Sequence, residues 1–384
     1  MPYWRLSTFY FFYFAALGTL MPYWGLYLQA LGFDAFSIGS LMAVIMATKV
    51  VAPNVWGWLG DNLGHRMLLV RLASLLALVS LLGMFAAQGF LQVALVMAFY
   101  SFFWNASLPQ FEAVVFNHLG NDAARYSRLR LWGSVGFILT VVMVGWLVDR
   151  RGTAVVLPAL IAVFGGILLS SLLVKEDGHE AHEAQPSILA VLKKPHILAF
   201  FAAVFLMQMS HGPYYAFFSI YLQDYAYSKS DIGLLWSIGV IAEVLLFLFM
   251  HRLLRRWRSA AILRVSLMLA ALRWLLIGWF PEVVPVLVVA QLLHAASFGS
   301  FHASAIHMVH DYFRGRHQGR GQALYASLSF GAGGALGTFI SGVIWEQWGA
   351  PLAYTMASAT ALLGAWVVWR HIPVGKVEEA SPAN

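Results

Sequence analysis

Several charged residues stand inside long apolar stretches of the sequence, where a charge is costly. Two are acids, Glu112 and Glu243, and two are arginines, Arg130 and Arg273. A charged side chain at the centre of a bilayer costs about 2.5–3.5 kcal/mol on insertion scales. Such residues usually face a cavity and pair with one another, and they often line a substrate or proton path. Their chemistry would be ion pairing, anion binding and proton uptake.

The spacing of Glu112 and Arg130 predicts that they meet. In an antiparallel helical hairpin, residues equally far from the turn lie at the same depth. These two are centred on the turn signal at 120–122, about 13 Å from it at 1.5 Å per residue. A static ion pair between helices is the alternative to a binding role.

A second group follows the same arithmetic. Glu243 and Arg273 are centred on the basic loop 255–259, about 22 Å from it and near mid-bilayer. Arg273 and His294 are centred on the turn at 281–285. Glu243, Arg273 and His294 are therefore expected at one depth on three successive helices.

Weaker candidates lie on other apolar stretches. His211 and Tyr215 flank Pro213, and a Gly-Pro interruption exposes backbone groups that a membrane tolerates only where a cavity or neighbour satisfies them. We predict a substrate-binding role for His211 and Tyr215, with a hydrogen-bonded histidine in a kinked helix as the alternative. Asn105 lies two turns before Glu112 on the same helix face and is a further candidate.

The composition requires that these residues be positioned by membrane helices. Of 384 residues, 60% are apolar and 11% charged, against about 25% charged in soluble domains. Zero cysteines and scattered basic residues exclude a disulfide scaffold and argue against nucleic-acid binding. A helix needs roughly 20 apolar residues to cross a bilayer. We predict twelve spans, at 6–30, 36–59, 66–88, 91–118, 126–149, 153–174, 197–222, 231–253, 261–280, 283–310, 319–345 and 351–371.

The loops predict orientation and domain organisation. Most Lys and Arg residues fall in loops on the same side of the membrane as the N-terminus. This bias predicts a protein of the cell membrane (inner or plasma) with both termini on the cytoplasmic side. One long polar segment divides the chain into two halves of six spans. The expected parts are an N-terminal bundle, a cytoplasmic linker, a C-terminal bundle and a cytoplasmic tail, at 1–174, 175–195, 196–372 and 373–384.

The two halves repeat short motifs, which indicates an internal duplication. Tyr27-Leu28-Gln29 recurs as Tyr221-Leu222-Gln223, and Ile38-Gly39 as Ile232-Gly233, both at an offset of 194. Residues 145–152 are echoed by 342–349. The same offset relates Lys49 to Glu243, so Lys49 is a candidate substrate counter-ion, or else a structural or snorkelling lysine. Two six-helix repeats with a site between them are typical of secondary transporters.

The loop between spans two and three carries a recognisable signature. Residues 57–66, Gly-Trp-Leu-Gly-Asp-Asn-Leu-Gly-His-Arg, resemble the conserved loop of the major facilitator superfamily, with matches at Gly57, Asp61, Gly64 and Arg66. The resemblance implies a cytoplasmic gate. Glycines permit close approach of helix ends, and Asp61 could pair with cationic or helix-terminal groups of the other bundle.

Within that superfamily, residues 126–137, 211–215 and 239–247 resemble the phenylpropionate–proton symporter family and its sugar–proton symporter relatives. The resemblance implies an all-α membrane protein with twelve transmembrane helices in two pseudo-symmetric six-helix bundles. It also implies that Glu112 and Arg130 contact substrate.

By the same similarity Glu243, Arg273 and His294 would link substrate to proton. Those relatives carry a proton-bearing acid one turn after the histidine, where this chain has Ser297.

Together these features predict a proton-coupled symporter that works by alternating access. The expected partners are the lipid bilayer, protons and a small solute, best an aromatic monocarboxylate and second a sugar or nucleoside. We expect a monomer without metal or cofactor. An uncoupled facilitator and a non-transporting receptor are alternatives. A membrane metalloenzyme is disfavoured because His302, His307 and His310 form only one loose cluster without i,i+4 histidine pairs, and the chain has no cysteine.

Overall fold

The chain is all helical in the computed structural model, which describes residues 2–119, 124–175, 189–314 and 317–372. The predicted turn at 120–122, most of the predicted linker at 175–195 and the predicted tail at 373–384 lie outside the described residues. The N-terminal half contains α1 (Tyr3–Ala30), α2 (Ala35–Leu63), α3 (Arg66–Leu82) with η1 (Gly83–Phe85), α4 (Phe90–Leu119), α5 (Ala124–Arg151), and η2 (Thr153–Val155) with α6 (Val156–Leu172).

The C-terminal half has more breaks but the same number of long segments. Its elements are α7 (Leu189–Leu192), α8 (Pro195–Ser210), α9 (Gly212–Asp224), α10 (Lys229–Arg256), α11 (Ser259–Trp279), α12 (Val284–His294), the π-helical η3 (Ala295–Ser300), α13 (Phe301–Tyr312), α14 (Gln318–Ala326), the π-helical η5 (Ser327–Gly333), α15 (Gly334–Trp348) and α16 (Ala350–His371).

Twelve long helical segments therefore run through the described chain, as predicted. Eleven of them are long and apolar enough to cross a membrane by length and composition. The twelfth, α1, has 28 residues and is long enough to span, because a helix rises 1.5 Å per residue. Its tyrosines lower its hydropathy, and many of them are buried against neighbouring helices.

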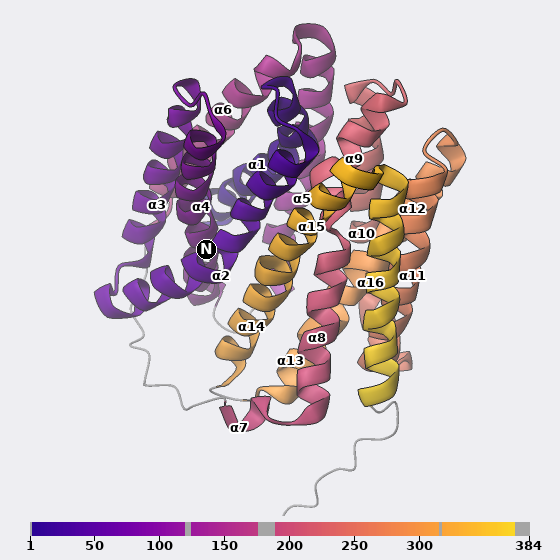
Figure 1. Cartoon of the computed structure of the whole chain (residues 1–384). Helices are drawn as coiled ribbons and strands as arrows, with labels where there is room; N and C mark the ends of the chain where they lie inside the picture. Colours follow the sequence, from indigo (N-terminus) through magenta and orange to yellow (C-terminus); the bar gives the residue numbers. More distant parts are fainter. Residues whose placement is uncertain (1, 120–123, 176–188, 315–316, 373–384) are drawn as a thin grey trace, which may run out of the picture.

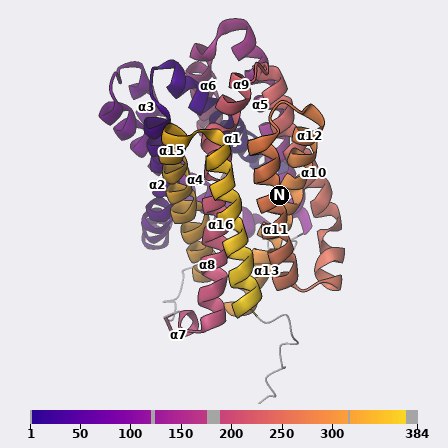
Figure 2. The same cartoon turned by 45° about the vertical axis from the view of Figure 1, so that its right-hand side comes forward.

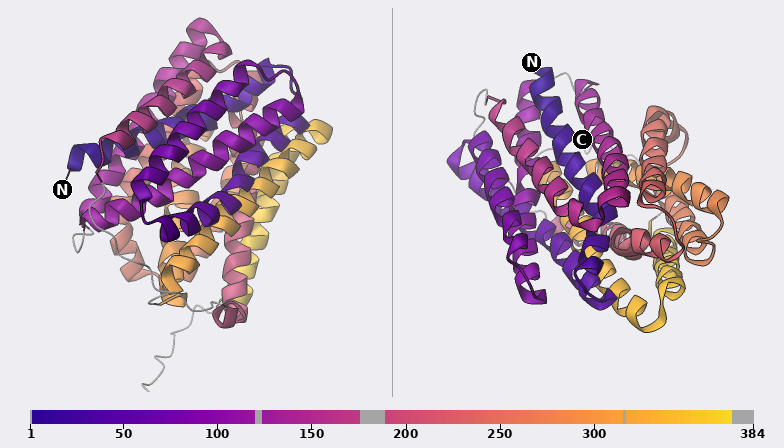
Figure 3. Two further views of the ribbon diagram at one scale, coloured as in Figure 1. Left: turned by 90° about the vertical axis from the view of Figure 1, so that its left-hand side faces the viewer. Right: turned by 90° about the horizontal axis from the view of Figure 1, so that it is seen from above.

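The helices form two bundles that lie side by side, the indigo-to-purple half and the pink-to-yellow half of Figure 1. Within the first, α1 packs on α5 and α6, and α3 on α4. Within the second, α16 packs on α8 and α11. The halves meet mainly where α2 contacts α15 and α5 contacts α10, an arrangement that can be followed in Figures 2 and 3. Two pairs of helices, one from each half, therefore form the main contacts between the bundles.

The seam between the halves is closest at repeated glycines. A Cβ on Gly39 of α2 would lie 2.7 Å from Cα of Gly342 of α15. On the opposite side of the seam, a Cβ on Gly145 of α5 would lie 2.5 Å from the carbonyl oxygen of Lys229 at the start of α10. Only glycine permits such backbone approach. The sequence echoes at Gly39, Gly145 and Gly342 therefore mark positions where the two halves touch.

One repeated residue meets its own copy. The Gln223 amide donates to the Gln29 side-chain oxygen at 3.2 Å, and these two glutamines are the last residues of the repeated Tyr-Leu-Gln motif. A residue can contact its counterpart in this way only near the axis that relates the two halves. The predicted duplication is therefore visible in the geometry.

Two carboxylates hold the halves together at one end of the molecule. Asp149, in the last turn of α5, accepts hydrogen bonds from the backbone N–H groups of Lys229 (2.7 Å) and Ser230 (2.8 Å). Glu346, in the last turn of α15, accepts one from the N–H of Ala35 (3.0 Å). Each acid thus caps the N-terminus of a helix in the other half, where unpaired N–H groups and the helix dipole favour negative charge.

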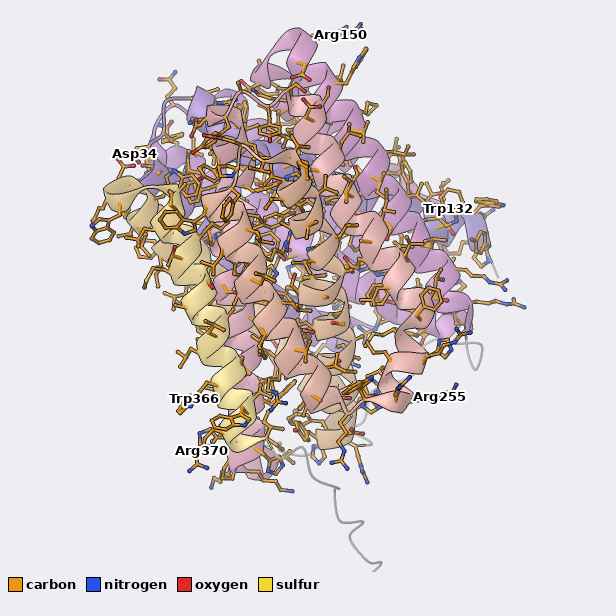
Figure 4. All side chains as sticks on the ribbon, turned by 90° about the vertical axis from the view of Figure 1, so that its right-hand side faces the viewer. Asp34, Trp132, Arg150, Arg255, Trp366 and Arg370 are labelled. Atoms are coloured by element: carbon orange, nitrogen blue, oxygen red, sulfur yellow. The ribbon has the colours of Figure 1, made fainter. Side chains whose placement is uncertain are left out.

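We call this end, with the loops 31–34 and 225–228, the far end, and the opposite one the terminal end. Figure 4 shows Asp34 and Arg150 toward the far end and Arg255 and Arg370 toward the terminal end. The hydrogen bonds that Tyr23, Gln29, Asp149 and Glu346 make with the opposite half all lie at the far end. The structure is therefore closed there.

Three of the long C-terminal segments are interrupted within their length. The predicted break in span seven is confirmed, because α8 ends at Ser210 and α9 begins at Gly212. The π-helical segments η3 and η5 were not predicted. π-Helical segments are rare in proteins, and those that occur often lie at functional sites.

Candidate functional site

In the N-terminal half, the structure brings Glu112 and Arg130 together. The Arg130 Nε lies 4.0 Å from a Glu112 carboxylate oxygen. The hydroxyl of Tyr126, one turn before Arg130, donates to the same oxygen at 2.9 Å. The guanidinium carbon stands 3.8 Å from the ring centre of Phe14. The pair is loose, and it is held by an aromatic face as much as by the acid.

This pair is enclosed yet open to solvent. Protein surrounds Glu112 on nearly all sides, but its side chain keeps 29% of its surface exposed and that of Arg130 keeps 37%. Both side chains are therefore partly accessible. A guanidinium that keeps accessible N–H groups can bind a carboxylate through two parallel hydrogen bonds.

In the C-terminal half, the structure brings Glu243, Arg273 and His294 together, as their common depth predicted. A Glu243 carboxylate oxygen lies 3.4 Å from Nε2 of His294. The other imidazole nitrogen, Nδ1, lies 3.1 Å from the Arg273 guanidinium. Because arginine can only donate, Nδ1 must be the acceptor, and the imidazole proton is placed on Nε2, facing Glu243. His294 thus lies between the acid and the arginine and contacts both.

Glu243 and Arg273 share this depth but do not form a direct ion pair in the structure. Arg273 is completely buried and donates to the carbonyl of Ala290 at 2.9 Å and to the side-chain oxygen of Gln291 at 3.2 Å. Its guanidinium carbon also lies 4.2 Å from the centre of the Tyr214 ring. Equal depth did not specify rotation about the helix axis, and His294 occupies the space between the two charges.

The charged residues of the N-terminal half and those of the C-terminal half interact electrostatically across the seam. Coulombic interactions join Arg130 of α5 to Glu243 of α10 and to His302 of α13. Charges in a low-dielectric surrounding interact much more strongly than in water. The charge of Arg130 therefore acts on an acid that belongs to the opposite bundle.

The break between α8 and α9 carries unpaired polar atoms. Nδ1 of His211 donates to the carbonyl of Met207 at 2.8 Å, which leaves Nε2 as a buried acceptor without a partner. Both amide atoms of Gln208 are buried and unpartnered as well. The ring of Tyr215 stacks on His211 at 5.5 Å. Buried polar groups are normally hydrogen-bonded, so this cluster offers donors and acceptors to a polar ligand.

Lys49 faces the seam from α2. A Cβ added to Gly331 of η5 would lie 2.6 Å from Val50 and 3.4 Å from the Lys49 carbonyl carbon. Its counterpart Glu243 packs instead within its own half, because a Cβ on Gly299 of η3 would lie 3.1 Å from its Cγ. Among the ion pairs between described residues, none involves Lys49. Its role as a substrate counter-ion stays a prediction.

Asn105 is engaged within its own bundle. Its amide donates to the hydroxyl of Thr48 at 2.9 Å and to the carbonyl of Ile45 at 3.3 Å, both on α2. The side chain is buried. In this structure it joins α4 to α2, and its donors are not directed to a ligand.

The predicted gate residues lie together, but within the N-terminal half. Asp61 pairs with Arg66 at 2.5 Å, and Arg66 also donates to the side chain of Gln110 on α4 at 2.8 Å. Gly64 has a φ of 75° and ends α2. The close approach expected of Gly57 is absent, since a Cβ there would meet nothing within 4 Å. Asp61 does not contact the other bundle here, since the halves are joined at the far end.

Several residues of the site were missed by the sequence reasoning. Tyr126 lies one turn before Arg130, and Gln291 lies three residues before His294, so helical spacing could have revealed both. Gln208 lies three residues before His211, so helical spacing could have revealed it too. Nothing in the sequence indicated that Phe14, on α1, lies under Arg130.

Comparison with known proteins agrees with this geometry. The MFS_1 like family matches residues 3–356. A probable 3-phenylpropionic acid transporter of Escherichia coli K12 is 28% identical over 363 residues, covering 92% of this chain and 93% of the relative. The maltose permease of Geobacillus stearothermophilus is 25% identical and covers 94% of this chain and 92% of its own.

Solved structures show the same fold. The nucleoside transporter NupG, as its D323A mutant, superimposes with a TM-score of 0.85 at 19% identity, over 96% of this chain and 98% of that one. A further relative by sequence, the putative nucleoside transporter YegT of Escherichia coli K12, is 25% identical over 350 residues, which covers 85% of this chain and 80% of the relative. The chain thus belongs to the MFS_1 like family and is a multi-pass secondary transporter of the major facilitator superfamily.

Proposed function

We propose that this transporter is a proton-coupled symporter of an aromatic monocarboxylate similar to 3-phenylpropionate. The observation that carries the proposal is Arg130, whose accessible guanidinium stands over Phe14 and is only loosely paired with Glu112. A carboxylate could bind its free donors while an aryl ring packs on neighbouring aromatic side chains. Lys49 would add positive charge, and His211 and Tyr215 would line the α9 side. The similarity to a probable 3-phenylpropionic acid transporter supports the same substrate class.

Proton coupling is assigned to Glu243, with His294 and Arg273 behind it. The carboxylate touches a neutral imidazole rather than a cation, so it can gain a proton without breaking an ion pair with arginine. Protonation would change its interaction with Arg130 on the other bundle and so bias the relative position of the halves. The protein would be a monomer in the cell membrane with both termini cytoplasmic, and the site would then open inward. The pair Asp61–Arg66 would join the bundles when that side closes.

The test is uptake into proteoliposomes under an imposed pH gradient. Glu243→Gln should abolish pH-driven accumulation of labelled 3-phenylpropionate, yet leave exchange of labelled for unlabelled substrate largely intact. Asp311→Asn, an exposed acid outside the site, is the matched control and should accumulate normally. Accumulation that survives in Glu243→Gln would make the proton assignment wrong, and accumulation that ignores the gradient in the unmodified protein would indicate a facilitator.

A sugar or nucleoside is the second candidate, and one observation favours it. Gln208 and His211 present buried, unpartnered hydrogen-bonding atoms, which would suit hydroxyl groups. A thermal-shift screen in detergent across aryl acids, sugars and nucleosides distinguishes the classes. Stabilisation by uridine or maltose but not by 3-phenylpropionate would replace the first substrate class by the second.

A further inference from the structure

His302 is a second histidine beside Glu243, and it differs from His294 in its hydrogen bonding. The rings of His294, Phe298 and His302 form one stacked column, with centres 5.2 and 6.2 Å apart and planes within 8° and 11°. The π-helical segment η3 spaces these residues. Glu243 contacts His294 directly and interacts electrostatically with His302. The acid therefore has an imidazole on either side of Phe298.

The partner of each imidazole decides whether it can accept a second proton. Nδ1 of His294 faces the Arg273 guanidinium, a group that only donates, so a proton on that nitrogen would break the bond and oppose two positive charges. Nδ1 of His302 lies 2.9 Å from the hydroxyl of Tyr325 on α14. A hydroxyl can donate to a bare nitrogen or accept from a protonated one. His302 can therefore become an imidazolium without losing its hydrogen bond.

We infer that His302 takes the proton from Glu243 and releases it at the terminal end, in place of the acid that Ser297 replaces. The inference rests on the proposed proton coupling. In this step the O–H bond of Glu243 breaks and an N–H bond forms at the ring nitrogen of His302 that carries no proton, by way of solvent in contact with both partly exposed side chains. The imidazolium then gives its proton to water.

Arg130 connects this step to substrate. The charged and titratable groups that face His302 are Glu243 from α10, Arg130 from α5 and Tyr325 from α14. The positive charge of Arg130 opposes an imidazolium at His302. A carboxylate bound to Arg130 offsets that charge, so substrate favours the proton on His302, and departure of substrate expels it. Substrate and proton would thus leave on the same side.

The experiment measures accumulation of labelled 3-phenylpropionate in proteoliposomes under an imposed pH gradient. With one proton per substrate, the unmodified protein should accumulate about tenfold for each pH unit. His302→Gln should reach only equal concentrations on the two sides while retaining exchange. His302→Asn, which keeps a polar atom for Tyr325, should do the same and covers the case in which the first variant fails to fold. His307→Gln, on the exposed face of α13, should behave as the unmodified protein.

Accumulation in both His302 variants equal to that of the unmodified protein would overturn this inference and leave the proposed function standing. Absence of pH-driven accumulation in the unmodified protein would remove both. Tyr325→Phe sharpens the result, because it keeps the imidazole and should retain accumulation with an altered pH profile. An unchanged pH profile in Tyr325→Phe would contradict the role assigned to the hydroxyl.

Discussion

The charged groups of the two halves are built in opposite ways. In the N-terminal half, Arg130 is accessible, loosely paired at 4.0 Å and supported by an aromatic ring. In the C-terminal half, Arg273 is completely buried and donates to a carbonyl, an amide and an imidazole. A free guanidinium can bind a ligand, whereas a saturated one can only position its neighbours. This difference supports the proposal that substrate binds in the N-terminal half and that the proton is handled in the C-terminal half.

The largest expected effect tests the buried side of this comparison. Arg273→Met would remove the guanidinium donor from Nδ1 of His294 and from the Ala290 carbonyl, at about 1–3 kcal/mol for each buried group left unpaired, whereas Gln291 keeps the hydrogen bond from Tyr214. We expect a large fall in the free energy of unfolding, measured by SDS titration in mixed micelles. Arg130→Met is the matched variant and should unfold almost as the unmodified protein does. Equal stability of the two variants would remove the difference between the halves.

The next effect concerns binding. Arg130→Met should weaken the binding of 3-phenylpropionate about 10- to 150-fold, because a hydrogen bond to a charged group contributes about 1.5–3 kcal/mol. Calorimetry on detergent-purified protein measures it. Arg255→Met, a basic residue at the terminal end, should bind as the unmodified protein. A carboxylate that binds Arg130→Met with full affinity does not use this arginine.

A smaller effect is expected from the residue that orients the pair. Tyr126→Phe removes the 2.9 Å hydrogen bond to Glu112, which is worth about 0.5–1.5 kcal/mol. Glu112 should then move closer to Arg130 and compete with substrate, so that affinity falls by a few-fold. The same titration measures it. Tighter binding in this variant would mean that the hydroxyl hinders the ligand rather than restraining the acid.

The smallest effect separates a structural amide from the site. Asn105→Ala should lower the free energy of unfolding by about 0.6 kcal/mol, the average for a hydrogen bond between membrane helices. Affinity for 3-phenylpropionate should not change, because the amide is bonded to α2. A marked loss of affinity at unchanged stability would restore Asn105 as a substrate-binding residue.

Much of this architecture could be predicted because apolar length and hairpin arithmetic fix depth. Equal depth correctly predicted that Glu112 lies near Arg130 and that His294 lies near both Glu243 and Arg273. Rotation about each helix axis is not encoded in that arithmetic, and so the interposed His294 was not foreseen. The π-helical segments also escaped prediction, since they depend on packing between helices rather than on local sequence. The repeated glutamines and glycines, by contrast, marked the seam correctly.

The most direct test is the pH dependence of 3-phenylpropionate affinity, measured by calorimetry between pH 6 and pH 8 on the unmodified protein, Arg130→Met and Glu243→Gln. If binding takes up a proton at Glu243, affinity in the unmodified protein falls as pH rises, since the deprotonated form binds less well. Glu243→Gln should bind with an affinity independent of pH, and Arg130→Met should bind weakly at every pH. A pH dependence that persists in Glu243→Gln, or full affinity in Arg130→Met, would contradict the assignment of proton and substrate to opposite halves.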